Sequence, residues 1–175
     1  MERGKGQVKY ALKFMQEKYQ NFTIRDWQQS DRASAAGVIK TVLEEYGLPW
    51  QPELADRDVI EVEQAYLKTG GEFWVVEQDA IVVGTAAYQP IARGKKAVEI
   101  RKMYLLPQAR SKGLGKYLLL ELEKAIAIKD YQEIWLETAT SLKEAVKLYE
   151  RNGYETAEGV ETARCDLIYL KRLHH

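Results

Sequence analysis

The chain has 175 residues, of which 46% are hydrophobic and 30% are charged. This length and balance predict a single globular domain that buries about two-thirds of its unfolded surface. The 26 basic and 26 acidic side chains cancel, which argues against nucleic acid as a partner, because such proteins usually carry a basic excess. No apolar run approaches the roughly 20 residues that span a bilayer, so we expect no membrane association and a cytoplasmic protein.

The cysteine and histidine content limits the chemistry. Cys165 is the only cysteine, so no intrachain disulfide can form and a reducing compartment is expected. We interpret it as a small apolar side chain within a strand. A catalytic thiol would need a histidine base, but His174 and His175 are the last two residues and are either native or part of a tag. Histidine-based triads and metal sites are therefore not expected.

The N-terminal residues 1–20 are interpreted as an extension ahead of a single domain over residues 21–172. Val8, Leu12, Met15 and Tyr19 have the spacing of one face of an amphipathic helix. Such a helix would be either peripheral or a docking contact, so a homodimer is left open.

Periodicity and turn residues predict the elements of the domain. In chain order these are a strand over 22–28, helices over 31–46 and 59–69, two strands within 73–90, a strand over 97–106, a helix from 114 to about 126, a strand over 133–138, a helix over 141–152, and strands over 154–156 and 163–170. The order predicts a mixed α+β fold in which the strand–helix–strand unit over 97–138 is parallel.

The loop from Arg110 to Gly115 has the composition of an anion site. It joins a predicted strand to a predicted helix, and the first amides of a helix lack partners within it. Glycines let a ligand approach the backbone, and the loop's cations add positive charge. The alternative is a tight connection with solvated cations. A P-loop is excluded because Arg110 and Tyr117 replace its glycine and hydroxyl residues, and Leu118 replaces the third glycine of the dinucleotide fingerprint.

Two motifs carry a family resemblance. Arg110-x-x-Gly113-x-Gly115, after a strand that ends in Arg-Lys-Met-Tyr-Leu-Leu-Pro, resembles the acyl-CoA signature of the GNAT N-acetyltransferases. The segment from Ala145 through Tyr149 to Gly153 and its following tyrosine resembles that family's A-x-x-x-Y-x-x-x-G-F/Y helix and turn. The resemblance covers roughly residues 22–170. It implies a mostly antiparallel twisted sheet of six or seven strands with about four flanking helices, splayed at the cofactor strand.

The resemblance also implies which residues bind the cosubstrate, acetyl-CoA. The pantetheine arm would pair with the splayed strand end, and the pyrophosphate would lie on the glycine loop. The implied cofactor-binding residues are Met103, Tyr104, Leu105, Arg110, Ser111, Lys112, Gly113, Leu114, Gly115 and Lys116. One departure is Leu142, which stands where the family often has an asparagine that contacts the cofactor.

Two catalytic roles follow from the same resemblance. Tyr149 would donate to the departing thiolate, because a phenol with a pKa of about 10 can act as an acid; core packing is the alternative. Glu99 would accept the acceptor's proton directly or through water, and the alternatives are ordered water alone or a surface carboxylate. Strand alternation predicts Glu99, Arg101 and Met103 on one face, with Ile100 and Lys102 on the other.

The implied reaction moves an acetyl group from acetyl-CoA to a primary amine of a small molecule or a protein. The acceptor would lie between residues 47–58 and 157–163. These loops carry Trp50, Glu53, Asp56, Asp58, Glu158 and Glu161. Their carboxylates either attract a cationic amine or are solvated loop charges. The alternative function is a non-catalytic acyl-CoA-binding regulatory module on the same fold.

Overall fold

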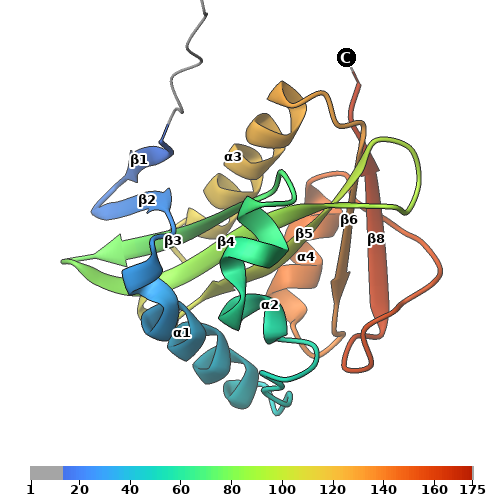
Figure 1. Ribbon diagram of the computed structural model, residues 1–175. Coiled ribbons are helices and arrows are strands. Elements are labelled where there is room, and N and C mark those ends of the chain that lie inside the picture. Colours follow the sequence, from blue (N-terminus) through green and yellow to red (C-terminus); the bar gives the residue numbers. More distant parts are fainter. Residues whose placement is uncertain (1–13, 175) are drawn as a thin grey trace, which may run out of the picture.

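A computed structural model describes residues 14–174, and one eight-stranded sheet organises this part of the chain (Figure 1). Its strand order is β1-β2-β3-β4-β5-β6-β8-β7. The strands are β1 (Gln16–Tyr19), β2 (Phe22–Asp26), β3 (Glu72–Gln78), β4 (Ile81–Ile91), β5 (Ala97–Leu105), β6 (Glu133–Thr138), β7 (Glu155–Thr156) and β8 (Leu167–Arg172). Neighbouring strands are antiparallel except β5 and β6, which confirms the predicted parallel unit.

Helices cover both faces of the sheet (Figure 1). They are α1 (Arg32–Glu45), α2 (Arg57–Ile60), α3 (Leu114–Ile128) and α4 (Lys143–Arg151). Strand β3 shows how the faces divide, since Phe73 and Val75 pack with α1 and Trp74 and Val76 pack with α3. A central strand with both faces covered reads as a continuous apolar run, as this one does. The mixed α+β fold is as predicted.

Strands β5 and β6 diverge soon after they meet. Their parallel pairing is limited to Ala97 with Glu133, Val98 with Ile134 and Glu99 with Trp135. Beyond this point β6 continues to pair with β8, whereas residues 100–105 of β5 have a strand partner only on the β4 side among residues 14–174. The divergence leaves one edge of β5 open beside α4.

A β-bulge in β5 changes which side chains share a face. The register against β4 shifts between Thr85 and Ala87, and Lys102 has a left-handed φ of 53°. An inserted residue reverses the alternation that follows it. Lys102 therefore reaches Asp58, as Arg101 does, while Met103 packs with the α3 core. The predicted split, with Met103 beside Arg101 and Lys102 opposite, is wrong for this reason.

The predicted helix over 59–69 is also broken. It is replaced by the short α2 and a π-helical turn over Glu63–Leu67. Arg32 donates to the carbonyl oxygen of Ile60, an acceptor that a continuous helix would use internally. This tertiary hydrogen bond thus competes with the backbone hydrogen bond that a continuous helix would form at Ile60.

Both ends of the chain differ from the predicted elements. Residues 16–19 form β1 rather than part of a helix, and residues 1–13 of that expected helix lie outside the described residues. Strand β8 begins at Leu167 instead of residue 163, because residues 162–165 form a turn in which the Cys165 amide donates to the Thr162 carbonyl oxygen at 3.0 Å. Within residues 14–174, no helix has the length and apolar character to cross a membrane.

Candidate active site

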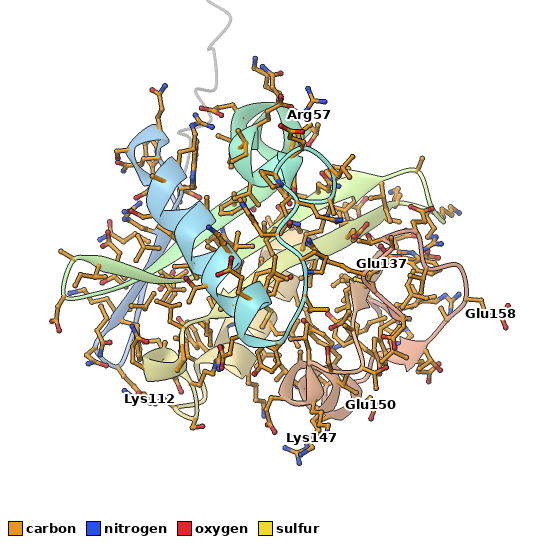
Figure 2. All side chains as sticks on the ribbon, turned by 90° about the horizontal axis from the view of Figure 1, so that it is seen from below. Arg57, Lys112, Glu137, Lys147, Glu150 and Glu158 are labelled. Atoms are coloured by element: carbon orange, nitrogen blue, oxygen red, sulfur yellow. The ribbon has the colours of Figure 1, made fainter. Side chains whose placement is uncertain are left out.

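A cleft of about 620 Å³ opens where β5 and β6 diverge. Its walls come from the end of α1, the second half of β5, the loop before α3, helix α4 and the loop before β8. Figure 2 views the molecule from below: Lys112 lies on the loop before α3, Lys147 and Glu150 lie along α4, and Glu137 lies further toward the middle. The cleft therefore lies at the meeting point of segments far apart in the sequence.

The glycine loop presents backbone donors at one end of the cleft. Gly113 precedes α3 in a left-handed conformation with a φ of 78°, and both Gly113 and Gly115 line the cleft. In the described part of the chain, the amides of Gly113, Leu114 and Gly115 donate no hydrogen bond, and the intrahelical ladder starts with Tyr117. Unpaired amides at a helix N-terminus favour an anion.

The cationic side chains that line the cleft lie in different environments. Lys116, Lys147 and Arg151 line the cleft, and Lys147 is 3.5 Å from the carboxylate of Glu144, which lines it too. Arg110 also lines it, but its guanidinium makes two 2.7 Å hydrogen bonds to Glu45 and donates to the carbonyl of Leu105 at 2.9 Å. Arg110 therefore ties the end of β5 to α1.

Most of the implied cofactor-binding residues meet in the cleft. Its lining includes Met103, Tyr104, Leu105, Arg110, Ser111, Gly113, Gly115 and Lys116. The side chains of Lys112 and Leu114 lie elsewhere: the Lys112 ammonium is 5.5 Å from the Phe22 ring centroid, and Leu114 is buried in the core. Leu142, which stands where the family often has an asparagine, also lines the cleft.

Tyr149 lines the cleft from α4 and is 6% exposed. Its ring packs between Tyr154 and Tyr169, with centroid distances of 5.9 and 6.1 Å. Its hydroxyl has no hydrogen-bond partner within residues 14–174, although a buried phenol usually has one. Burial raises the pKa of Tyr149 above its usual range, so the phenol stays protonated at neutral pH. It can donate a proton to a group in the cleft.

Glu99 lies beside the cleft rather than in its lining. Burial raises the pKa of Glu99 above its usual range, and the nearby charges of Glu137 and Glu161 add to this, while Arg101 opposes it. Arg101, which lines the cleft, has its Nε 3.5 Å from a Glu99 carboxylate oxygen. A carboxylate with a raised pKa is a stronger base than an ordinary one, which suits it to accept a proton.

Glu137 is a cleft residue that the sequence analysis missed. Its carboxylate accepts hydrogen bonds from the backbone amide of Glu161 and from the hydroxyl of Thr162 at 2.7 Å. It therefore anchors the loop before β8 to β6. No motif marks this residue, and its role depends on a loop 24 residues away in sequence.

Asp56 forms a buried ion cluster beside the cleft. Its carboxylate accepts from Lys102 at 2.8 Å and from Arg164 at 2.5 and 2.6 Å. Burial would raise the pKa of Asp56, but hydrogen bonds from Arg164 and the charge of Lys102 outweigh it and lower the pKa to about 2. Asp56 is thus neither a solvated loop charge nor free to bind a cationic amine, because both cations already occupy it.

The other acceptor-loop residues are dispersed. Asp58 is 9% exposed and accepts from the Tyr66 hydroxyl, and Trp50 packs against the core beneath α1. Glu53 and Glu158 are exposed, and Glu161 is 3.8 Å from Arg93. Residues 47–58 contribute Leu48 to the cleft lining, residues 157–163 contribute none, and the carboxylates of the two loops do not form one cluster.

Together the splayed sheet, the glycine loop and the tyrosine helix define the class of acyl-CoA-dependent acetyltransferases. The family model described as "Acetyltransferase (GNAT) family" matches residues 38–154. The chain belongs to this family and is an N-acetyltransferase enzyme.

Relatives support the same family. The "Uncharacterized N-acetyltransferase YjgM" of Escherichia coli K12 is 38% identical over 128 residues, which cover 71% of this chain and 77% of that protein. "N-acetyltransferase 8F1" of Rattus norvegicus is 29% identical over 115 residues, covering 62% of this chain and 52% of that protein. The aligned region thus spans only about half of this mammalian relative.

Solved structures share the fold. A GNAT-family acetyltransferase from Staphylococcus aureus Mu50 superposes with a TM-score of 0.81 at 19% identity, covering 87% of this chain and 99% of that one. The PaiA N-acetyltransferase of Thermoplasma acidophilum, solved in complex with coenzyme A, gives a TM-score of 0.67 at 21% identity, covering 87% and 99%. At these identities the likeness concerns the fold.

Proposed function

We propose that the cleft binds acetyl-CoA and that the chain transfers its acetyl group directly to a primary amine. The observation that carries the proposal is the arrangement of the cleft. Within the described part of the chain, the loop amides at one end and the Tyr149 hydroxyl beside the open edge of β5 have no hydrogen-bond partner. One end suits a pyrophosphate and the other a reacting thioester.

The cosubstrate would follow the open edge of β5. An extended, amide-containing arm can add to a free strand edge in the manner of another strand, here along residues 103–105. The pyrophosphate would accept hydrogen bonds from the amides of residues 111–116, with Lys116 nearby. Because Arg110 holds the Leu105 carbonyl, it would keep the arm-binding strand end and the phosphate loop in one arrangement.

The reaction requires the acceptor nitrogen to lose two protons and the departing sulfur to gain one. The acceptor ammonium must lose a proton, because only the free amine is nucleophilic. Glu99 would receive it through water, since its carboxylate lies outside the cleft lining. The amine nitrogen then bonds to the thioester carbonyl carbon, and a backbone N–H near Leu105 would stabilise the oxyanion. When the C–S bond breaks, Tyr149 would protonate the thiolate, and the nitrogen would release its second proton to solvent, from which the phenol is reprotonated.

The acceptor is proposed to be a small-molecule or protein amine that enters beside the loop before β8. Asp56 does not select it by charge, because Lys102 and Arg164 already neutralise that carboxylate. Lys102 and Arg164 are held in place by Asp56. The acceptor would therefore be selected by the other residues that line the cleft.

Thiol release from acetyl-CoA across a panel of small amines, amino acids and peptides tests the proposal. We expect at least one amine to stimulate thiol release and to appear as its N-acetyl product by mass spectrometry. Calorimetry with CoA is the parallel measurement. Tight CoA binding without turnover of any amine would favour the non-catalytic module, and absence of CoA binding would refute the proposed cleft occupant.

A further inference from the structure

The turn between β1 and β2 contacts the glycine loop directly. The Tyr19 hydroxyl donates to the carbonyl oxygen of Lys112 at 2.8 Å, and the Gln20 side-chain amide donates to the same oxygen at 3.1 Å. These contacts join residues more than 90 positions apart in sequence. In Figure 1 the β1–β2 hairpin, in blue, lies at the edge of the sheet. One loop carbonyl is thus fixed by two donors from outside the loop.

Fixing this carbonyl also fixes the direction of a loop amide. The described chain contains no cis peptide bond, so the Lys112 carbonyl and the Gly113 N–H point to opposite sides of one planar unit. The carbonyl points to the hairpin, and Gly113 lines the cleft. Holding the oxygen on the hairpin therefore turns the Gly113 N–H away from it, toward the cleft.

The surrounding contacts hold the donor itself in place. The Tyr19 ring stacks on Tyr117 of α3 with a centroid distance of 4.5 Å. A Cβ atom at Gly113 would lie 2.6 Å from the Tyr19 hydroxyl oxygen, so any larger residue here would displace the hydroxyl from its present position. The hairpin, the loop and the first turn of α3 thereby form one packed unit.

We propose that Tyr19 and Gln20 are positioning residues that orient the glycine loop for the pyrophosphate of the cosubstrate. The inference rests on the proposed function, because it places an anion on the loop. Both residues precede residues 38–154, the region that the family match covers. They act through the backbone of Lys112 and Gly113 and touch no reacting atom.

The test uses Tyr19→Phe, which keeps the stacked ring, together with Gln20→Met, which keeps the side-chain length. In the double variant we expect about a tenfold rise in KM for acetyl-CoA and in Kd for CoA, because two hydrogen bonds to one carbonyl are lost. The value of kcat and the KM for the amine should change less than twofold. S-acetylpantetheine, which lacks the pyrophosphate, should show no change in kcat/KM.

Tyr117→Phe is the matched control, since its hydroxyl has no hydrogen-bond partner in the described chain while its ring forms the other half of the stack. It should leave KM for acetyl-CoA unchanged. Thermal unfolding shows whether each variant is folded at the assay temperature.

If wild-type protein binds CoA and the double variant binds it equally well, the inference is wrong. Equal losses with acetyl-CoA and S-acetylpantetheine would also overturn it, because they would indicate general distortion. If wild-type protein does not bind CoA, the proposed function fails instead.

Discussion

Replacing Asp56 by asparagine tests whether a buried ion cluster joins the loops beside the cleft. The Asp56 side chain has no exposed surface, and those of Lys102 and Arg164 are 4% and 7% exposed. Removing one member of a buried ion pair costs about 3–5 kcal/mol, because its partner's charge stays buried without compensation. Here two cations would lose their shared carboxylate. We therefore expect Asp56→Asn to lower the free energy of unfolding by about 3 kcal/mol or more.

The pH dependence of the free energy of unfolding gives a second, independent measure of what Asp56 contributes to stability. The Asp56 pKa of about 2, against an ordinary value of 3.8, corresponds to about 2 kcal/mol of stability. Because the folded-state pKa is the lower one, this contribution is fully present well above pH 4 and is lost as the pH falls toward 2. About half of it is lost by pH 3. The difference in stability between wild-type protein and Asp56→Asn should therefore narrow by about 1 kcal/mol between pH 7 and pH 3.

Urea unfolding followed by tryptophan fluorescence, at constant ionic strength, measures both quantities. Glu53→Gln is the matched control, because Glu53 lies on the same loop and is exposed. It should change the free energy of unfolding by no more than about 0.5 kcal/mol. A loss below about 1 kcal/mol for Asp56→Asn, or a loss that is the same at pH 7 and pH 3, would refute the reasoning.

Three further variants test the proposed site. Tyr149→Phe should lower kcat by about 100-fold and leave CoA affinity within twofold, because only the proton donor is lost; an unchanged kcat would remove Tyr149 from the acid role. Glu99→Gln should lower kcat/KM for the amine and flatten the acidic limb of its pH profile, whose midpoint lies above the usual carboxyl pKa because burial raises the pKa of Glu99. An unaltered profile would identify ordered water as the base. Gly113→Ala should weaken CoA binding about tenfold, because φ is 78° and the new Cβ would meet Tyr19. Its control is Gly37→Ala, where a Cβ meets nothing within 4 Å and CoA affinity should not change.

Local patterns sufficed for the elements that depend on local interactions. The glycine loop before α3, the parallel β5–α3–β6 unit and the tyrosine helix α4 all lie where the sequence predicts them. Each has a signal within a few residues: apolar periodicity, a glycine that ends an element, or a motif of known spacing. The family resemblance rests on these segments, and the match over residues 38–154 confirms it.

Local patterns failed where a distant group competed with the backbone. The predicted helix over 59–69 breaks because Arg32, 28 residues away, donates to the Ile60 carbonyl oxygen, which a continuous helix would use for its own hydrogen bond. The bulge at Lys102 inserts one residue, and one residue leaves no periodic trace in a nine-residue strand. It nevertheless moves an ammonium group to the other face of the sheet, where it meets Asp56.

The sequence by itself determined the fold class, the family and the segments that form the candidate site, because these follow from spacing along the chain. Only the tertiary structure showed the pairing of Asp56 with Lys102 and Arg164, which are 46 and 108 residues away. It also brought Tyr19 and Gln20 of the expected extension onto the glycine loop. Such contacts depend on packing between distant elements, and a short polar segment carries no local signal for the partner that it will meet.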